Sequence, residues 1–182
     1  MSSSGGLPVN CLIRVVDDEG NALPDGQTGI VMVHSDSMML DLPPATDSRW
    51  QGWHDSGDLG VIDSGGRLRI VGRRREVIKA RDGTLVFPAE VEAALMAISG
   101  VHEAAVFGHT VTDGTEHIIA AVILDAAEER FAERAKPLLL SALGQNRLPS
   151  RIFELDSLPR VASQKIDRSA LRRSLGKRLE DL

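Results

Sequence analysis

The sequence predicts an α+β fold, in which a small antiparallel β unit precedes a domain with a roughly three-stranded sheet packed by helices. Short β-branched runs separated by turn residues fill the chain up to Gly72, and apolar residues at helical spacing appear only after it. From there strands and helices alternate, and the strands are few. We therefore expect a disordered leader over residues 1–6, a β subdomain over 7–72, a hinge over 73–76 and a second domain over 77–182.

The β unit is predicted from two pairs of short runs. Residues 11–17 and 29–34 are rich in β-branched residues, and turn residues lie between them. Residues 59–63 and 67–71 flank a Ser-Gly-Gly turn, which is typical of a hairpin. These runs indicate antiparallel strands joined by short connections.

The second domain is predicted to begin with a helix over residues 88–98. Proline stands at its start, acidic residues follow in the first turn, and the apolar residues recur at helical spacing. The remaining expected elements are strands over 104–108, 118–124 and 151–155, and helices over 126–143 and 167–180.

Composition and charge argue against several classes of function. A net charge of −5 argues against a general nucleic-acid binder, because that affinity comes mostly from neutralising phosphates. No apolar run approaches the ~20 residues that span a bilayer, and the start has neither the basic nor the apolar region of a signal peptide. We therefore expect no membrane partner and a cytoplasmic location. The five histidines lack partners at metal-ligand spacing, so no metal site is expected.

Two short motifs lie about a hundred residues apart. The first spans residues 52–60 (Gly-Trp-His-Asp-Ser-Gly-Asp-Leu-Gly) and is followed by Ile-Val-Gly-Arg at 70–73. The second spans residues 158–168 and reads Leu-Pro-Arg-Val-Ala-Ser-Gln-Lys-Ile-Asp-Arg. Together they resemble the C-terminal third of the acyl-adenylate-forming enzymes, which include acyl-CoA synthetases, adenylation domains of peptide synthetases and luciferases. The resemblance runs from about Leu7 to about Leu175.

Asp58 and Arg73 are the residues that the first motif singles out. A carboxylate has two acceptor oxygens, so Asp58 can accept hydrogen bonds from both hydroxyls of a ribose. The resemblance implies that Asp58 binds the nucleotide ribose, and that Arg73 contacts the ribose beside the hinge. It also implies that the chain pivots at Arg75 through its backbone. The alternatives are a strand that merely opens with Gly-Asp, and a solvated basic cluster, to which we assign the neighbouring Arg74.

Lys165 is the residue that the second motif singles out. The resemblance implies a catalytic lysine, whose ammonium reaches the attacking carboxylate and the α-phosphate and neutralises growing charge. The alternative is one more cation in a basic tail. The family has glycine directly before this lysine, and this chain has Gln164, which allows fewer backbone conformations.

Residues 79–88 depart further from the family, which places a glycine-rich turn here that lines the entry route of the thiol. Gly83 is the one glycine in this segment. The resemblance implies that Gly83 lines this route, and that Lys79 could contact a phosphate of CoA or phosphopantetheine. The alternative is an exposed loop cation without a role.

The resemblance implies that the chain is the C-terminal part of a ligase that forms acyl-AMP from a carboxylic acid and ATP, with Mg²⁺ held outside this chain. The family's large ATP- and acid-binding region is not in the sequence, so we expect an N-terminal partner region in cis or in trans and no activity without it. A carrier protein or CoA could then accept the acyl group. The alternative is a freestanding, non-catalytic module that binds a carrier protein, a nucleotide or another subunit. Uncovered apolar edges of the β unit also allow a homodimer.

Overall fold

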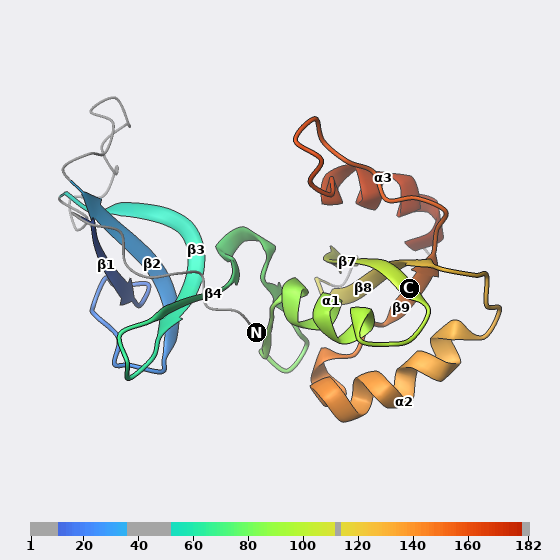
Figure 1. Cartoon of the computed structure of the whole chain (residues 1–182), viewed down its shortest axis with the longest axis horizontal. Helices are drawn as coiled ribbons and strands as arrows, with labels where there is room; N and C mark the ends of the chain where they lie inside the picture. The colour runs from blue at the N-terminus through green and yellow to red at the C-terminus, as the bar shows by residue number, and fades with distance from the viewer. Residues whose placement is uncertain (1–10, 36–51, 112–113, 180–182) are drawn as a thin grey trace. The chain divides into compact units, whose positions relative to one another are not determined.

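The computed structural model describes residues 11–35, 52–111 and 114–179, in two compact units, Met1–Arg75 and Glu76–Leu182 (Figure 1). Each unit buries its own hydrophobic core. The leader expected over residues 1–6 lies outside the described residues. In the described part of the chain, no helix is long and apolar enough to cross a membrane.

The first unit is a four-stranded antiparallel sheet in chain order, which confirms the predicted β unit. Its strands are β1 (Cys11–Val16), β2 (Thr28–Ser35), β3 (His54–Ile62) and β4 (Leu68–Arg73). Val16, Ile30 and Met32 form the core, against which Trp53 and Leu59 pack. Strand β3 begins five residues earlier than predicted, so the first motif lies mostly inside a strand.

Strand β3 contains an irregularity at the first motif. Ile30 pairs with Leu59 and Met32 pairs with Asp55, so residues 56–58 oppose Val31 alone. Gly57 has φ +72°, a left-handed conformation that glycine adopts readily. Such bulges interrupt the ladder of hydrogen bonds and change the direction of side chains. This bulge therefore determines where Asp58 points.

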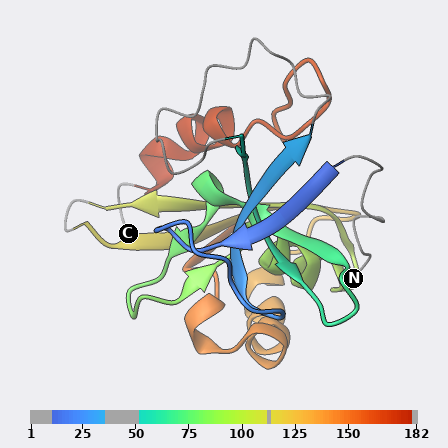
Figure 2. The same cartoon turned by 90° about the vertical axis from the view of Figure 1, so that its left-hand side faces the viewer.

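The second unit is a three-stranded sheet in the order β7-β8-β9 between two helical layers (Figures 1 and 2). Strands β7 and β8 are antiparallel, and β9 runs parallel to β8 after the crossover helix α2. The elements are β5 (Ile78–Lys79), β6 (Leu85–Val86), α1 (Pro88–Met96), β7 (Val101–Thr110), β8 (Glu116–Leu124), α2 (Phe131–Leu143), β9 (Arg151–Glu154) and α3 (Arg168–Leu179). A short 3₁₀ helix, η3 (Gln145–Arg147), completes it, and another, η2 (Arg74–Glu76), spans the boundary between the two units in the chain.

Successive side chains of a strand point to opposite faces of this sheet, so alternate residues share a face. Val106 and Ala120 face α1 and α2, whereas Phe107, Ile119 and Phe153 face α3. This three-stranded sheet with helices on both faces confirms the predicted α+β fold.

One sequence expectation about this unit is wrong, and one element was not predicted. The helix expected over 126–143 begins only at Phe131, because Glu128 bonds back to Arg134 and the preceding residues form turns. The short hairpin of β5 and β6 was not expected, since two-residue strands leave no readable alternation.

Candidate functional site

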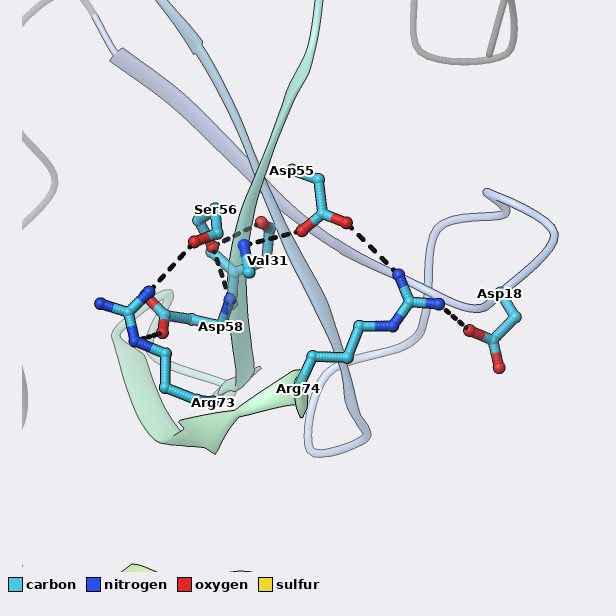
Figure 3. Close-up of polar contacts among 8 residues, drawn as sticks. Asp18, Val31, Asp55, Ser56, Asp58, Arg73 and Arg74 are labelled. Atoms are coloured by element: carbon cyan, nitrogen blue, oxygen red, sulfur yellow. Dashed lines mark hydrogen bonds and ion pairs between the residues drawn. The ribbon is translucent and has the colours of Figure 1, made fainter. Parts of the chain in front are cut away.

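Asp58 and Arg73 form an ion pair across β3 and β4 (Figure 3). The two residues are partners in the strand register, and Arg73 Nε lies 3.0 Å from Asp58 Oδ1. Arg73 Nη1 also donates to the carbonyl oxygen of Ser56 at 3.2 Å. The Asp58 side chain is 23% exposed, and a carboxylate can accept about four hydrogen bonds. The Asp58 carboxylate can thus accept further hydrogen bonds at the protein surface.

Side chains hold the backbone that leads into Asp58. The Ser56 hydroxyl donates to the carbonyl oxygen of Val31 at 2.9 Å and accepts from the Asp58 amide at 3.1 Å. The Gly57 amide donates to Asp55 Oδ1 at 2.8 Å. A Cβ at Gly57 would come no closer than 3.9 Å to Arg73, so glycine is favoured here by its φ rather than by space.

Lys165 lies at the end of a tight hairpin that precedes α3. The Val161 amide donates to the carbonyl oxygen of Lys165, and the Gln164 amide donates to that of Val161, both at 2.9 Å. The Lys165 side chain is exposed to solvent. The second motif is therefore a surface hairpin with an available ammonium group near its tip.

Gln164 takes the left-handed conformation, with φ +64°, and is the only non-glycine residue among the described ones with a positive φ. The same pair of backbone hydrogen bonds closes four further described hairpins, each with glycine in this position: Gly20, Gly66, Gly83 and Gly114. Gln164 thus adopts a conformation that glycine reaches more easily, although it allows fewer backbone conformations. The backbone keeps the glycine-like conformation at a cost of about 1 kcal/mol.

Two arginines attach the base of the Lys165 hairpin to the sheet. Arg160 donates to the carbonyl oxygen of Gln164 at 2.7 Å and also bonds to Glu103 on β7. Arg168 donates to the carbonyl oxygen of Val106 at 3.1 Å and to Glu92 Oε1 at 2.7 Å. The hairpin is thus fixed on both sides.

Asp167 joins this hairpin to α3. Its Oδ1 accepts from the Ala170 amide at 2.9 Å, which is a helix N-cap. Its own amide donates to the carbonyl oxygen of Pro159 at 2.7 Å. The start of α3 and the position of Lys165 are therefore coupled.

Gly83 occupies the left-handed position of the β5–β6 hairpin, with φ +86°. Asp82 stabilises this turn by accepting from the amide of Thr84 at 3.0 Å and from its hydroxyl at 2.7 Å. The Thr84 amide, followed by its hydroxyl, lowers the pKa of Asp82 below 3.8. The Lys79 side chain is exposed, and its amide donates to Glu116 at 2.8 Å.

Comparison with known proteins finds relatives in sequence and in fold. The AMP-binding enzyme C-terminal domain family matches residues 90–165. Indoleacetate–CoA ligase of Aromatoleum aromaticum is 29% identical over 180 residues, which are 97% of this chain and 35% of that protein. Fatty acid–[acyl-carrier-protein] ligase ScoC of Streptomyces coeruleorubidus is 33% identical, over 87% of this chain and 31% of that protein. ATP-bound MatB from Rhodopseudomonas palustris superposes with a TM-score of 0.85 at 28% identity, over 95% of this chain and 35% of that one.

The chain belongs to the acyl-adenylate-forming superfamily. It corresponds to the C-terminal portion of these enzymes and spans about a third of the length of the relatives that it matches.

The residues expected from the superfamily motifs lie on both units. Asp58 and Arg73 lie side by side in the first unit, whereas Lys165 and Gly83 lie on different hairpins of the second. Among residues 11–35, 52–111 and 114–179, no group of three or more histidine, cysteine or acidic residues could hold a metal ion.

Sequence reasoning missed the partners that hold these residues in place. Arg74, which was assigned to the solvated cluster, contacts Asp55 and Asp18. Arg168 was noted only as the end of the second motif, and its contact with Glu92 joins residues 76 positions apart. No local pattern indicates either contact, although the place of Arg168 three residues after Lys165 in the motif was a usable signal.

Proposed function

We propose that the chain is the C-terminal part of a ligase that activates a carboxylic acid as its acyl-AMP with ATP, and that it works with an N-terminal adenylation region in cis or in trans. The observation that carries this proposal is the exposed Lys165 on a hairpin fixed at its base, within a domain that matches the superfamily. An ammonium held in this way can stabilise the charge that develops during attack on the α-phosphate.

Asp58 and Arg73 would bind the nucleotide ribose. Asp58 supplies the acceptors for the two hydroxyls, and Arg73 fixes the orientation of the carboxylate through their 3.0 Å pair. The ATP bound in the related MatB structure supports nucleotide use. Mg²⁺ would be held by residues of the N-terminal region, with no ligand from this chain.

Arg75 would be the pivot between the two units. Arg74 is bonded to Asp18 within the first unit, and Glu76 lies 3.6 Å from Arg168 within the second. Between them, Arg75 makes no ion pair or side-chain hydrogen bond to another described residue. Backbone rotation at Arg75 therefore breaks no hydrogen bond or ion pair of its own side chain to a described residue, as expected for a hinge.

The second half-reaction would pass the acyl group to a thiol, with Gly83 lining the entry route and Lys79 near a phosphate of the thiol-bearing acceptor. CoA and a carrier-protein phosphopantetheine are both candidates, since the relatives include a CoA ligase and an acyl-carrier-protein ligase. A cytoplasmic location and a homodimer remain predictions, the latter supported by Leu12, which is 61% exposed on the edge strand β1.

The test is ATP–pyrophosphate exchange with a panel of carboxylic acids. We expect no exchange by the 182-residue chain alone and exchange when a candidate N-terminal region is added. Strong exchange by the chain alone would contradict the dependence on a partner region. No exchange with any N-terminal region would favour the non-catalytic module instead.

A further inference from the structure

Arg74 lies at the end of the β3–β4 hairpin and contacts two carboxylates from different parts of the first unit (Figure 3). Its Nη1 is 3.3 Å from Asp55 Oδ2 and its Nη2 is 2.7 Å from Asp18 Oδ1. We propose that Arg74 and Asp55 are positioning residues for the nucleotide site, because they fix the bulge that carries Asp58. This inference rests on the proposed ribose-binding role of Asp58.

Asp55 connects the arginine to the backbone of the bulge. One of its oxygens, Oδ2, faces Arg74, and the other, Oδ1, accepts from the Gly57 amide at 2.8 Å. The side chain of Arg74 is thereby linked, through one carboxylate, to the residue directly before Asp58.

The bulge depends on such side chains because its pairing with β2 is interrupted. Residues 56–58 oppose Val31 alone, and the amides of Gly57 and Asp58 donate to the side chains of Asp55 and Ser56. An extra segment of this kind has fewer ladder bonds to define its conformation. These side-chain contacts therefore help to set the direction of the Asp58 carboxylate, together with its pair with Arg73.

Asp18 prevents Arg74 from turning away from Asp55. It follows the end of β1, and its pair with Arg74 joins residues 56 positions apart. The two consecutive arginines thus have different tasks: Arg73 contacts the Asp58 carboxylate itself, whereas Arg74 holds the backbone beneath it. Since the Arg74 side chain is 47% exposed, we expect effects of several-fold rather than orders of magnitude.

The first measurement uses the whole 182-residue chain alone and follows amide hydrogen exchange of Gly57 and Asp58 by NMR. We expect Asp55→Ala to accelerate exchange most, by about tenfold, and Arg74→Ala by about threefold. The matched control is Arg67→Ala, which removes another exposed arginine–aspartate pair of the same unit, to Asp63 at 2.9 Å. That variant should leave both amides unchanged.

The second measurement uses the chain with its N-terminal region. Arg74→Ala and Asp55→Ala should raise the KM for ATP by about three- to tenfold at unchanged kcat and unchanged KM for the acid, because only ribose binding is impaired. The double variant should equal Asp55→Ala alone, since the two residues act through one contact. Arg67→Ala should keep the KM for ATP.

Two results would overturn the inference: equal exchange at Gly57 and Asp58 in the Arg74→Ala and Arg67→Ala variants, or additive effects in the double variant. If no N-terminal region restores ligase activity, the proposed function fails, while the exchange measurement on the chain alone still decides whether Arg74 holds the bulge.

Discussion

At the scale of single residues, Gln164 is the most unusual feature of the chain. Four other described hairpins with the same hydrogen bonds have glycine in its position. A side chain in the left-handed region raises the energy of the folded state, whereas glycine also increases the entropy of the unfolded chain. The hairpin that contains Lys165 is therefore less stable than the same hairpin would be with glycine at position 164.

Gln164→Gly should increase the free energy of unfolding by up to about 1 kcal/mol, because relief of the left-handed conformation exceeds the added chain entropy. Gly83→Ala makes the opposite change, from glycine to a residue with a side chain, in a hairpin with the same hydrogen bonds. A Cβ at Gly83 would meet no atom within 4 Å, so its expected loss of about 1 kcal/mol is purely conformational. Urea unfolding of the two variants measures both values, and a loss of stability in Gln164→Gly would contradict this account.

Sequence motifs single out candidate site residues more readily than the side chains that position them. Asp58, Arg73 and Lys165 follow from short motifs of fixed spacing. The contact of Arg74 with Asp18 depends instead on strand register and on a bulge, neither of which leaves a local pattern. The proposed functions of Asp58, Arg73 and Lys165 remain predictions.

At the scale of elements, several tight turns are held by an acidic side chain. Asp63 accepts from the amides of Gly65 and Arg67 in the β3–β4 turn, at 2.9 and 3.0 Å. The Arg67 amide, followed by the Arg67 side chain, lowers the pKa of Asp63 below 3.8. The carboxylate form is thus preferred in the folded state.

This preference has a defined dependence on pH. Because the folded-state pKa of Asp63 lies below the unfolded value of about 3.8, its stabilising contribution is present above pH 3.8 and is lost as the pH falls through the folded-state value. Asp63→Asn should therefore make the free energy of unfolding fall less steeply below pH 4. Urea titrations from pH 7 to pH 2.5 measure this, and identical slopes in both proteins would be contrary evidence.

The boundaries of the elements were predictable where alternation or helical spacing extends over many residues. Strand β8 and helix α3 agree closely with expectation. The predicted start of α2 was wrong, because the contact between Glu128 and Arg134 favours turns before Phe131. The bulge in β3 was not predictable, because glycine at position 57 is equally compatible with a simple turn.

At the scale of the whole molecule, two units with separate cores meet at Arg75 and Glu76. Arg75→Pro restricts both this residue and the one before it. We expect it to reduce one half-reaction by at least ~10-fold and to spare the other, because one orientation of the second unit becomes disfavoured. Arg75→Ala is the control and should retain both rates. Equal loss of both half-reactions in Arg75→Pro would argue against a pivot at this position.

The central claim is that Lys165 takes part in adenylate formation and that the second unit, which carries it, then rotates about Arg75. The most direct measurement compares the two half-reactions of the Lys165→Ala variant in the presence of the N-terminal region. Adenylate formation should fall by at least ~100-fold, the loss expected for one preorganised charge. Thioester formation from a supplied acyl-adenylate should change little.

Two variants control this measurement. Lys136→Ala removes another exposed lysine of the second unit, on α2, and should affect neither step. Asp58→Ala should weaken nucleotide binding in both steps, since the ribose stays bound throughout. A large loss in adenylation alone is the result that we predict for Lys165→Ala. Equal losses in both half-reactions, or no loss in either, would contradict the account.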